Sequence, residues 1–129
     1  MLRHNSLILG AGLLTAGLAA AGHSDAAGSN HGLTCEVRVR PAGAGVDLTA
    51  IANSAVTASG KYRLVVIKRG PAGGTEIEQS GSFSIEAGGV SNLSSVSPTL
   101  ESGATYDAEL TITSQSIQIT CRRVLPPML

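Results

Sequence analysis

The sequence predicts an all-β fold, a sandwich of seven antiparallel strands. Beyond residue 30, apolar and polar residues alternate with a period of two, which is typical of strands with one buried face. Glycine- and proline-containing turns interrupt this pattern, and no stretch shows the period of an amphipathic helix. Seven short strands in a domain of about 100 residues indicate an immunoglobulin-like sandwich, of which the fibronectin type III domain is one example.

The first part of the chain is interpreted as a signal peptide and a flexible leader, residues 1–27. Arg3 and His4 precede an uncharged apolar run at residues 7–21, and small residues that suit a cleavage site follow it. This run is shorter than the roughly 20 residues of a membrane-spanning helix. We therefore expect an exported protein with no membrane segment after cleavage; an uncleaved N-terminal anchor is the alternative. Residues 28–129 then form one domain, with its core in residues 33–124.

The first two strands are expected at residues 33–40 and 46–53, with a turn at residues 41–45 between them. Ser59 and Gly60 are interpreted as the break that follows the second strand. Alternation gives these two strands one set of inward apolar side chains: Leu33, Cys35, Val37, Val39, Val46, Leu48, Ala50 and Ala52.

The third strand is expected at residues 61–69 and the fourth at residues 75–80, on either side of a Gly-rich turn at residues 70–74. The fourth strand continues to Ile85 past a bulge at residues 80–81. The inward side chains of these strands again follow alternation: Tyr62, Leu64, Val66, Ile77, Phe83 and Ile85.

Residues 90–100 are predicted to be irregular, because their apolar residues do not alternate. Two clear strands follow, at residues 106–113 and 117–122, and alternation gives them one set of inward side chains: Tyr106, Ala108, Leu110, Ile112, Ile117, Ile119 and Cys121. Tyr106 opens the first of these strands just after a Gly-containing corner, which is the position of a tyrosine corner. Its hydroxyl should bond to the backbone near residues 101–103; an ordinary tyrosine at a strand start is the alternative.

Cys35 and Cys121 are the two cysteines of the chain, and both fall on the inward faces of their strands. Exported proteins favour disulfides. The first and last strands of such a sandwich can be neighbours. The sequence therefore predicts a disulfide between Cys35 and Cys121, and two buried free thiols are the alternative.

The composition argues against catalysis and against nucleic-acid binding. All three histidines precede residue 32, so the domain offers neither a His-containing triad nor a usual zinc site. Three aromatic residues and a balance of nine basic and nine acidic residues do not suit nucleic acid. The carboxylates of Glu76, Glu78, Asp107 and Glu109 are interpreted as solvated strand faces. We expect a non-enzymatic protein without cofactor or metal.

Basic residues gather on three predicted strands. If these strands share a sheet, one surface is positive and attracts acidic partners; a solvated face that keeps strand edges apart is the alternative. Val65 and Ile67 stand between Arg63 and Arg69 on the outward face of the third strand, a mixed patch that suits a transient extended partner unless a loop covers it. The basic residues of the three strands are Arg38, Arg40, Lys61, Arg63, Lys68, Arg69, Arg122 and Arg123.

Four segments carry a resemblance to a known family in their order and spacing. They read LTCEV at residues 33–37, GKYRLVVIK at 60–68, EQSGSF at 78–83 and SIQITC at 116–121. The sequence resembles the curli-assembly chaperones of the CsgC/CsgH type, and CsgH most. The Cys-x-Cys pair of the CsgC branch is absent, because Glu36 and Val37 follow Cys35; this makes a redox role doubtful.

The resemblance implies a periplasmic immunoglobulin-like sandwich that keeps the curli amyloid subunit, a disordered Gln/Asn-rich chain, from nucleating too early. It implies a non-enzymatic protein that acts at low stoichiometry through electrostatically guided contacts. We also expect a monomer. An exported binding or adhesion module and a pilus-type strand-exchange chaperone are the alternatives. The residues predicted to bind the partner are Arg63, Lys68 and Arg69, supported by Lys61, Arg38 and Arg40.

Overall fold

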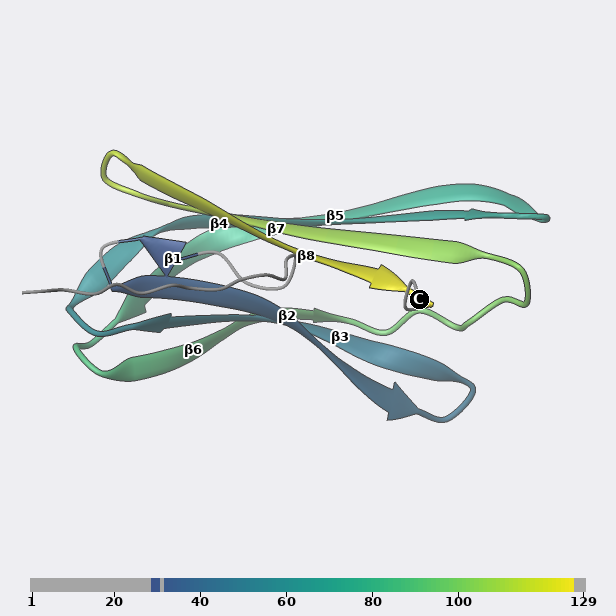
Figure 1. Ribbon diagram of the computed structural model, residues 1–129, viewed down its shortest axis with the longest axis horizontal. Coiled ribbons are helices and arrows are strands. Elements are labelled where there is room, and N and C mark those ends of the chain that lie inside the picture. Colours follow the sequence, from purple (N-terminus) through teal and green to yellow (C-terminus); the bar gives the residue numbers. More distant parts are fainter. Residues whose placement is uncertain (1–28, 31, 127–129) are drawn as a thin grey trace, which may run out of the picture.

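The computed structural model describes residues 29–30 and 32–126, and within this part the alternating residues form strands. Two four-stranded antiparallel sheets pack face to face, in the orders β1-β2-β3-β6 and β5-β4-β7-β8 (Figure 1). The strands are β1 Ser29–Asn30, β2 Leu33–Ala42, β3 Gly45–Ser54, β4 Ala58–Gly70, β5 Gly73–Ile85, β6 Gly89–Val96, β7 Thr105–Ser114 and β8 Ile117–Leu125.

The predicted all-β sandwich is confirmed, while its immunoglobulin-like character stays a prediction. Seven of the strands have at least eight residues, and β1 has two. The described residues form no helix, so none of them builds one that could cross a membrane. The predicted signal peptide and leader, residues 1–27, lie outside the described residues.

The core lies between the two sheets and consists mostly of the side chains that alternation assigned to the inward faces, joined by Val96, Ala104 and Leu125. Leu48, Leu64, Leu110 and Ile112 are almost fully buried. Val39, Tyr62 and Ile77 are partly buried at its margins. Burial of these apolar surfaces is the main favourable contribution to folding, at about 25 cal/mol per Å².

A disulfide joins Cys35 of β2 to Cys121 of β8, as predicted, and so ties one sheet to the other. Both cysteines are 2% exposed, and their Cα atoms are 6.0 Å apart. Because the bond spans 86 residues of sequence, it removes much of the conformational freedom of the unfolded chain.

The hydroxyl of Tyr106 fixes the segment between β6 and β7. It accepts a hydrogen bond from the amide of Glu101 and donates one to the carbonyl of Thr99, each 2.9 Å long. The predicted bonding of this hydroxyl to the backbone upstream is therefore confirmed. The ring itself is buried in the core, so the loop is anchored to the packed interior.

The prediction of irregular structure at residues 90–100 is wrong for its first half, where β6 pairs with β3. The pairing shifts between Ala50 and Ile51, since Ala50 faces Ser94 and Ile51 faces Asn92. Leu93 is the extra residue of this bulge, and it packs against the core. A bulge breaks the period of two. For this reason the strand could not be identified by alternation.

The two other interruptions predicted from glycines are also wrong. Ser59 and Gly60 lie inside β4, which begins at Ala58. A Cβ on Gly60 would lie 2.0 Å from the carbonyl oxygen of Thr113, so glycine permits the close approach of this neighbouring strand. No bulge occurs at residues 80–81, because β4 and β5 pair without a shift. Gly81 instead leaves room for the ring of Tyr62, which lies directly across from it.

The disulfide predicts a large loss of stability when it is removed. The Cys35→Ala/Cys121→Ala variant should unfold with a free energy about 4 kcal/mol lower, measured by urea denaturation, because its unfolded chain regains the freedom of an 86-residue loop. Strong reductant should bring the wild type close to the variant. A difference below about 1 kcal/mol in oxidising buffer would show that the bond does not hold the sheets together.

The two tyrosines permit a matched test of the Tyr106 hydroxyl. Tyr106→Phe should lower the free energy of unfolding by about 1 to 3 kcal/mol, because the backbone groups of Glu101 and Thr99 lose their partner inside the fold. Tyr62→Phe is the control, since within the described residues its hydroxyl has no hydrogen-bond partner. Equal effects of the two substitutions in the same denaturation assay would contradict this role.

Candidate functional site

The outward side of the β5-β4-β7-β8 sheet carries three of the six predicted binding residues, and we call it the charged face. Alternation along β4 places Lys61, Arg63, Val65, Ile67 and Arg69 on it. The register adds residues from the neighbouring strands: Glu76 and Glu78 of β5, Asp107 and Glu109 of β7, and Arg122 of β8. The face thus carries four cations and four carboxylates, so it is not a basic surface.

The centre of the charged face is apolar and is flanked by carboxylates. Val65 stands between Glu78 on one side and Glu109 on the other. Ile67 stands in the same way between Glu76 and Asp107. Neither apolar side chain is fully exposed or fully buried, so the predicted mixed patch exists, with acidic rather than basic nearest neighbours.

Two ion pairs lie on the charged face. Glu78 binds Arg63 and thereby raises the pKa of that guanidinium above its ordinary value. Arg122 donates to Asp107, with 2.9 Å between Nε and Oδ1, and this hydrogen bond lowers the pKa of the Asp107 carboxyl. The side chains of Arg63 and Glu78 are 59% and 45% exposed, so water screens their pair and its contribution to stability is small.

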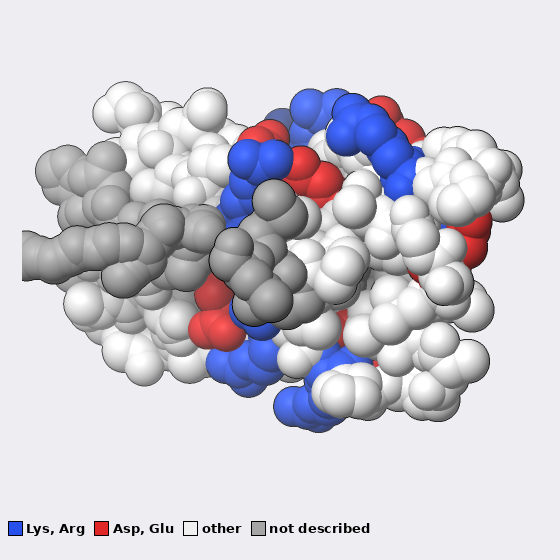
Figure 2. Space-filling model, turned by 45° about the vertical axis from the view of Figure 1, so that its right-hand side comes forward, with Lys and Arg blue, Asp and Glu red and all other residues white. Residues whose placement is uncertain are grey.

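Lys61 and Arg69 lie near opposite ends of the outward side of β4. Within residues 32–126, neither has a carboxylate within 4 Å. They are therefore the cations of this face whose charge is least neutralised by a neighbour. Figure 2 shows the general pattern on one side of the molecule, where basic and acidic side chains adjoin one another and uncharged surface lies toward both ends.

Lys68 is not part of the charged face, because its side chain points to the inner side of the sheet, opposite Tyr106. Its Nζ lies 2.5 Å from Oε1 of Glu101, and the side chains of this pair are only 27% and 25% exposed. The other oxygen of Glu101 accepts a hydrogen bond of 3.1 Å from the amide of Ala72. This cluster joins the β4–β5 turn to the loop before β7, which is a structural role.

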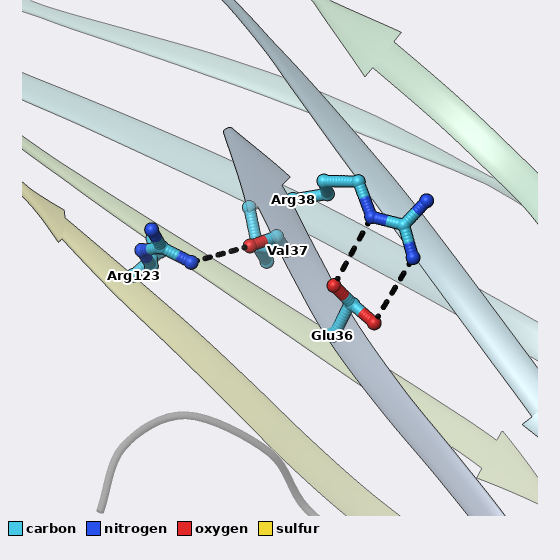
Figure 3. A network of polar contacts seen from close by, with 4 residues as sticks. All are labelled: Glu36, Val37, Arg38 and Arg123. Carbon is cyan, nitrogen blue, oxygen red and sulfur yellow. Dashed lines mark hydrogen bonds and ion pairs between the residues drawn. The ribbon is translucent and has the colours of Figure 1, made fainter. Parts of the chain in front are cut away.

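Arg38 and Arg40 belong to β2 and thus to the other sheet. Arg38 pairs with Glu36 on the same strand, with 3.2 Å between Nε and Oε2 (Figure 3). Arg40 has no carboxylate within 4 Å in the described part of the chain. The six predicted binding residues therefore occupy three places, and only Lys61, Arg63 and Arg69 lie on one face. Their role in binding stays a prediction.

The sequence did not indicate a binding role for the four carboxylates of the charged face, and it indicated one for Arg122 only as part of a shared basic surface. Their spacing at alternate positions of two strands was visible, and it indicated an outward face. The order of the strands was not visible, and only that order places these carboxylates beside Val65 and Ile67. Across residues 32–126, no group of three or more His, Cys, Asp or Glu side chains is arranged to hold a metal ion.

Known proteins share this fold. A family model described as CsgH protein matches residues 34–124. The solution structure of R. palustris CsgH is similar at 30% identity, over 70% of this chain and 89% of the other, with a TM-score of 0.60. A structure of the E. coli curli protein CsgC, in a SeCys form, covers 72% of this chain and 97% of its own at 14% identity and a TM-score of 0.60, which concerns the fold alone. No curated protein matches the chain.

The Lys68–Glu101 pair predicts a specific pH dependence of stability. The hydrogen bond from Lys68, followed by that from Ala72, holds the pKa of Glu101 below its ordinary value of 4.5. A carboxyl with a lowered pKa in the folded state stabilises the fold above its unfolded pKa and loses this contribution as the pH falls. The wild type should therefore lose stability below about pH 4.5.

Glu101→Gln should flatten this acid dependence, with part of it retained by Asp107, whose pKa is also lowered. Melting temperatures between pH 7 and pH 3 measure the effect. Glu86→Gln is the matched control, because Glu86 is exposed and forms no ion pair within residues 32–126. Identical pH profiles for Glu101→Gln and the wild type would show that the ion pair does not stabilise the loop.

Proposed function

We propose that this chain, which belongs to the CsgH family, is a non-enzymatic chaperone that delays amyloid nucleation of a curli subunit during curli biogenesis. The observation that carries this proposal is the family match over residues 34–124, which includes nearly all of the sandwich. That membership supports a curli-related role. The proposal adds three points to that role: the nucleation step, the partner and the mode of contact.

The charged face suits brief contacts with extended, disordered chains. Lys61 and Arg69 attract acidic groups, while Val65 and Ile67 offer a small apolar contact between carboxylates. A face with both signs of charge attracts and repels a given segment at neighbouring positions, so long-lived capture is not favoured. Amyloid nucleation requires several strands to pair in register. A weak contact with an early oligomer can disturb that register without a stoichiometric complex.

The proposed location is the periplasm, reached through the N-terminal signal. The buried disulfide fits an oxidising compartment of this kind. The proposed working form is a monomer. In that form the charged face is open to the subunit.

Amyloid growth of a purified curli subunit, followed by thioflavin fluorescence, tests the function directly. The exported protein, purified from an expression host, would be added at ratios from about one-to-one to about 1:100. A long extension of the lag at the lowest ratios is the expected result. A lag that lengthens only near one-to-one would instead indicate capture of the monomer, as by a strand-exchange chaperone. An unchanged lag at all ratios would contradict the chaperone role and leave an exported binding module.

The Lys61→Gln/Arg69→Gln variant should need an about tenfold higher concentration for the same delay, because electrostatic attraction raises the rate of encounter. The control is Ala87→Glu/Ser116→Glu, which changes the net charge equally at exposed turn positions away from the charged face. Added salt should weaken the wild type more than the variant. Equal loss of activity in variant and control would attribute the effect to net charge and not to this face.

A further inference from the structure

One side of the sandwich ends in an unpaired strand edge. β1 pairs only with Leu33 and Thr34, so from Cys35 to Ala42 the outer edge of β2 has no partner strand among the described residues. β8 is the corresponding edge of the other sheet, and the disulfide holds the two edges together. An edge of this kind presents main-chain donors and acceptors that can pair with another extended chain.

The direction of these main-chain groups follows from one contact. Arg123 of β8 donates to the carbonyl oxygen of Val37 across the gap between the edges, at 3.5 Å (Figure 3). The carbonyl of Val37 therefore points away from β3. In an antiparallel strand, the amide and carbonyl of one residue point to the same side, and those of the residue two positions further along point there too. Val37 and Val39 thus offer their amides at the open edge, and Pro41, which has no N–H, ends the series.

An apolar cavity of about 430 Å³ opens beside this edge, between the end of the β2–β3 hairpin, the loop before β7 and the end of β8. Val39 and Leu125 come from the two edge strands, and Leu100 is 43% exposed at the loop before β7. The apolar side chains that line the cavity are Val39, Val46, Leu100, Ala104, Tyr106 and Leu125.

The rim of the cavity and the adjoining edge are cationic. Arg123 lines the cavity, and Arg40 follows Val39 on the edge strand. Neither has a carboxylate within 4 Å in the described part of the chain. Glu101 also lines the cavity, but Lys68 and the Ala72 amide bind its two oxygens. Arg123 is therefore the cation at the opening itself, while Arg40 lies on the outer side of the edge strand, across from Asp47.

We propose that the open edge of β2 and this cavity form one docking groove for an extended acidic segment of another protein. The segment pairs through its main chain with Val37 and Val39 and inserts one large apolar side chain into the cavity. Its carboxylates meet Arg40 and Arg123. The bond from Arg123 to Val37 is long for a hydrogen bond and yields readily to a new strand. The groove does not depend on the function proposed above.

The choice of an extended segment rests on the combination of features. An unpaired edge, a cavity for one side chain and flanking charges are the parts that recognition by added strands requires. A second copy of this chain would bring its own arginines against Arg40 and Arg123 if the same edges met. Charge complementarity therefore favours an acidic partner over self-association.

The peptide acetyl-EVELEV-amide, in which acidic and apolar residues alternate as in a strand, is the probe. It would be titrated into the ¹⁵N-labelled exported protein, with acetyl-KVKLKV-amide as its control. We expect saturable amide shifts at Val37, Val39 and residues 100–104, slower hydrogen exchange at Val37 and Val39, and no such response to the lysine peptide. Shifts confined to the charged face, or equal responses to both peptides, would overturn the proposal.

Two variants separate the parts of the groove. Arg40→Gln/Arg123→Gln should weaken binding of the acidic peptide about tenfold, since each arginine pairs with one carboxylate. Val39→Pro removes the amide of Val39 from the open edge. This amide makes no hydrogen bond to β3, so the pairing of β2 with β3 is kept, while the slower exchange at Val37 should be abolished. An unchanged melting temperature of either variant shows that it folds, and unchanged affinity in both would refute the groove.

Two other occupants would also refute it. Shifts at Val37 and Val39 that grow with protein concentration, without peptide, would mean that a second copy fills the groove. A chain shortened after Pro126 that binds the peptide much more tightly would mean that residues 127–129 are its natural occupant.

Discussion

The disulfide between Cys35 and Cys121 is the contact on which the arrangement of both proposed binding surfaces depends. It joins β2 and β8, which are neighbours across the gap between the sheets and do not pair through their main chains. On this side of the sandwich, side-chain packing alone would hold the two sheets together without the disulfide. The disulfide therefore fixes the distance between the edge strands β2 and β8. The open edge of β2 and the outward face of the other sheet therefore keep a constant relation to each other.

On the charged face the two signs of charge lie on different strands: cations on β4 and β8, carboxylates on β5 and β7. Carboxylates on β5 and β7 flank the cations and apolar residues of β4. A partner that approaches this face meets attraction at Lys61 and Arg69 and a mixed environment between them. Such a surface is suited to many short contacts, which is what a chaperone acting below one-to-one requires. The edge of β2 differs, because its open main-chain groups adjoin a cavity that is lined by Arg123 of β8.

Most of the fold follows from alternation, since the inward residues of β2, β3, β4, β7 and β8 were predicted correctly. The same parity also groups Lys68 with Leu64 and Val66, so its inward position was readable from the sequence. The bulge at Leu93 and the roles of Gly60 and Gly81 could not be predicted, because each depends on a neighbouring strand that is distant in sequence. Strand order likewise decided that Arg38 and Arg40 lie apart from Arg63.

The comparison of seeded and unseeded amyloid growth tests the central claim most directly. At a ratio of about 1:50, the exported protein should lengthen the lag of a fresh curli subunit several-fold. The same amount should leave elongation from preformed fibril seeds almost unchanged, because added seeds bypass nucleation. Equal slowing of both reactions would place the action at fibril ends and would contradict a chaperone that acts on the nucleus.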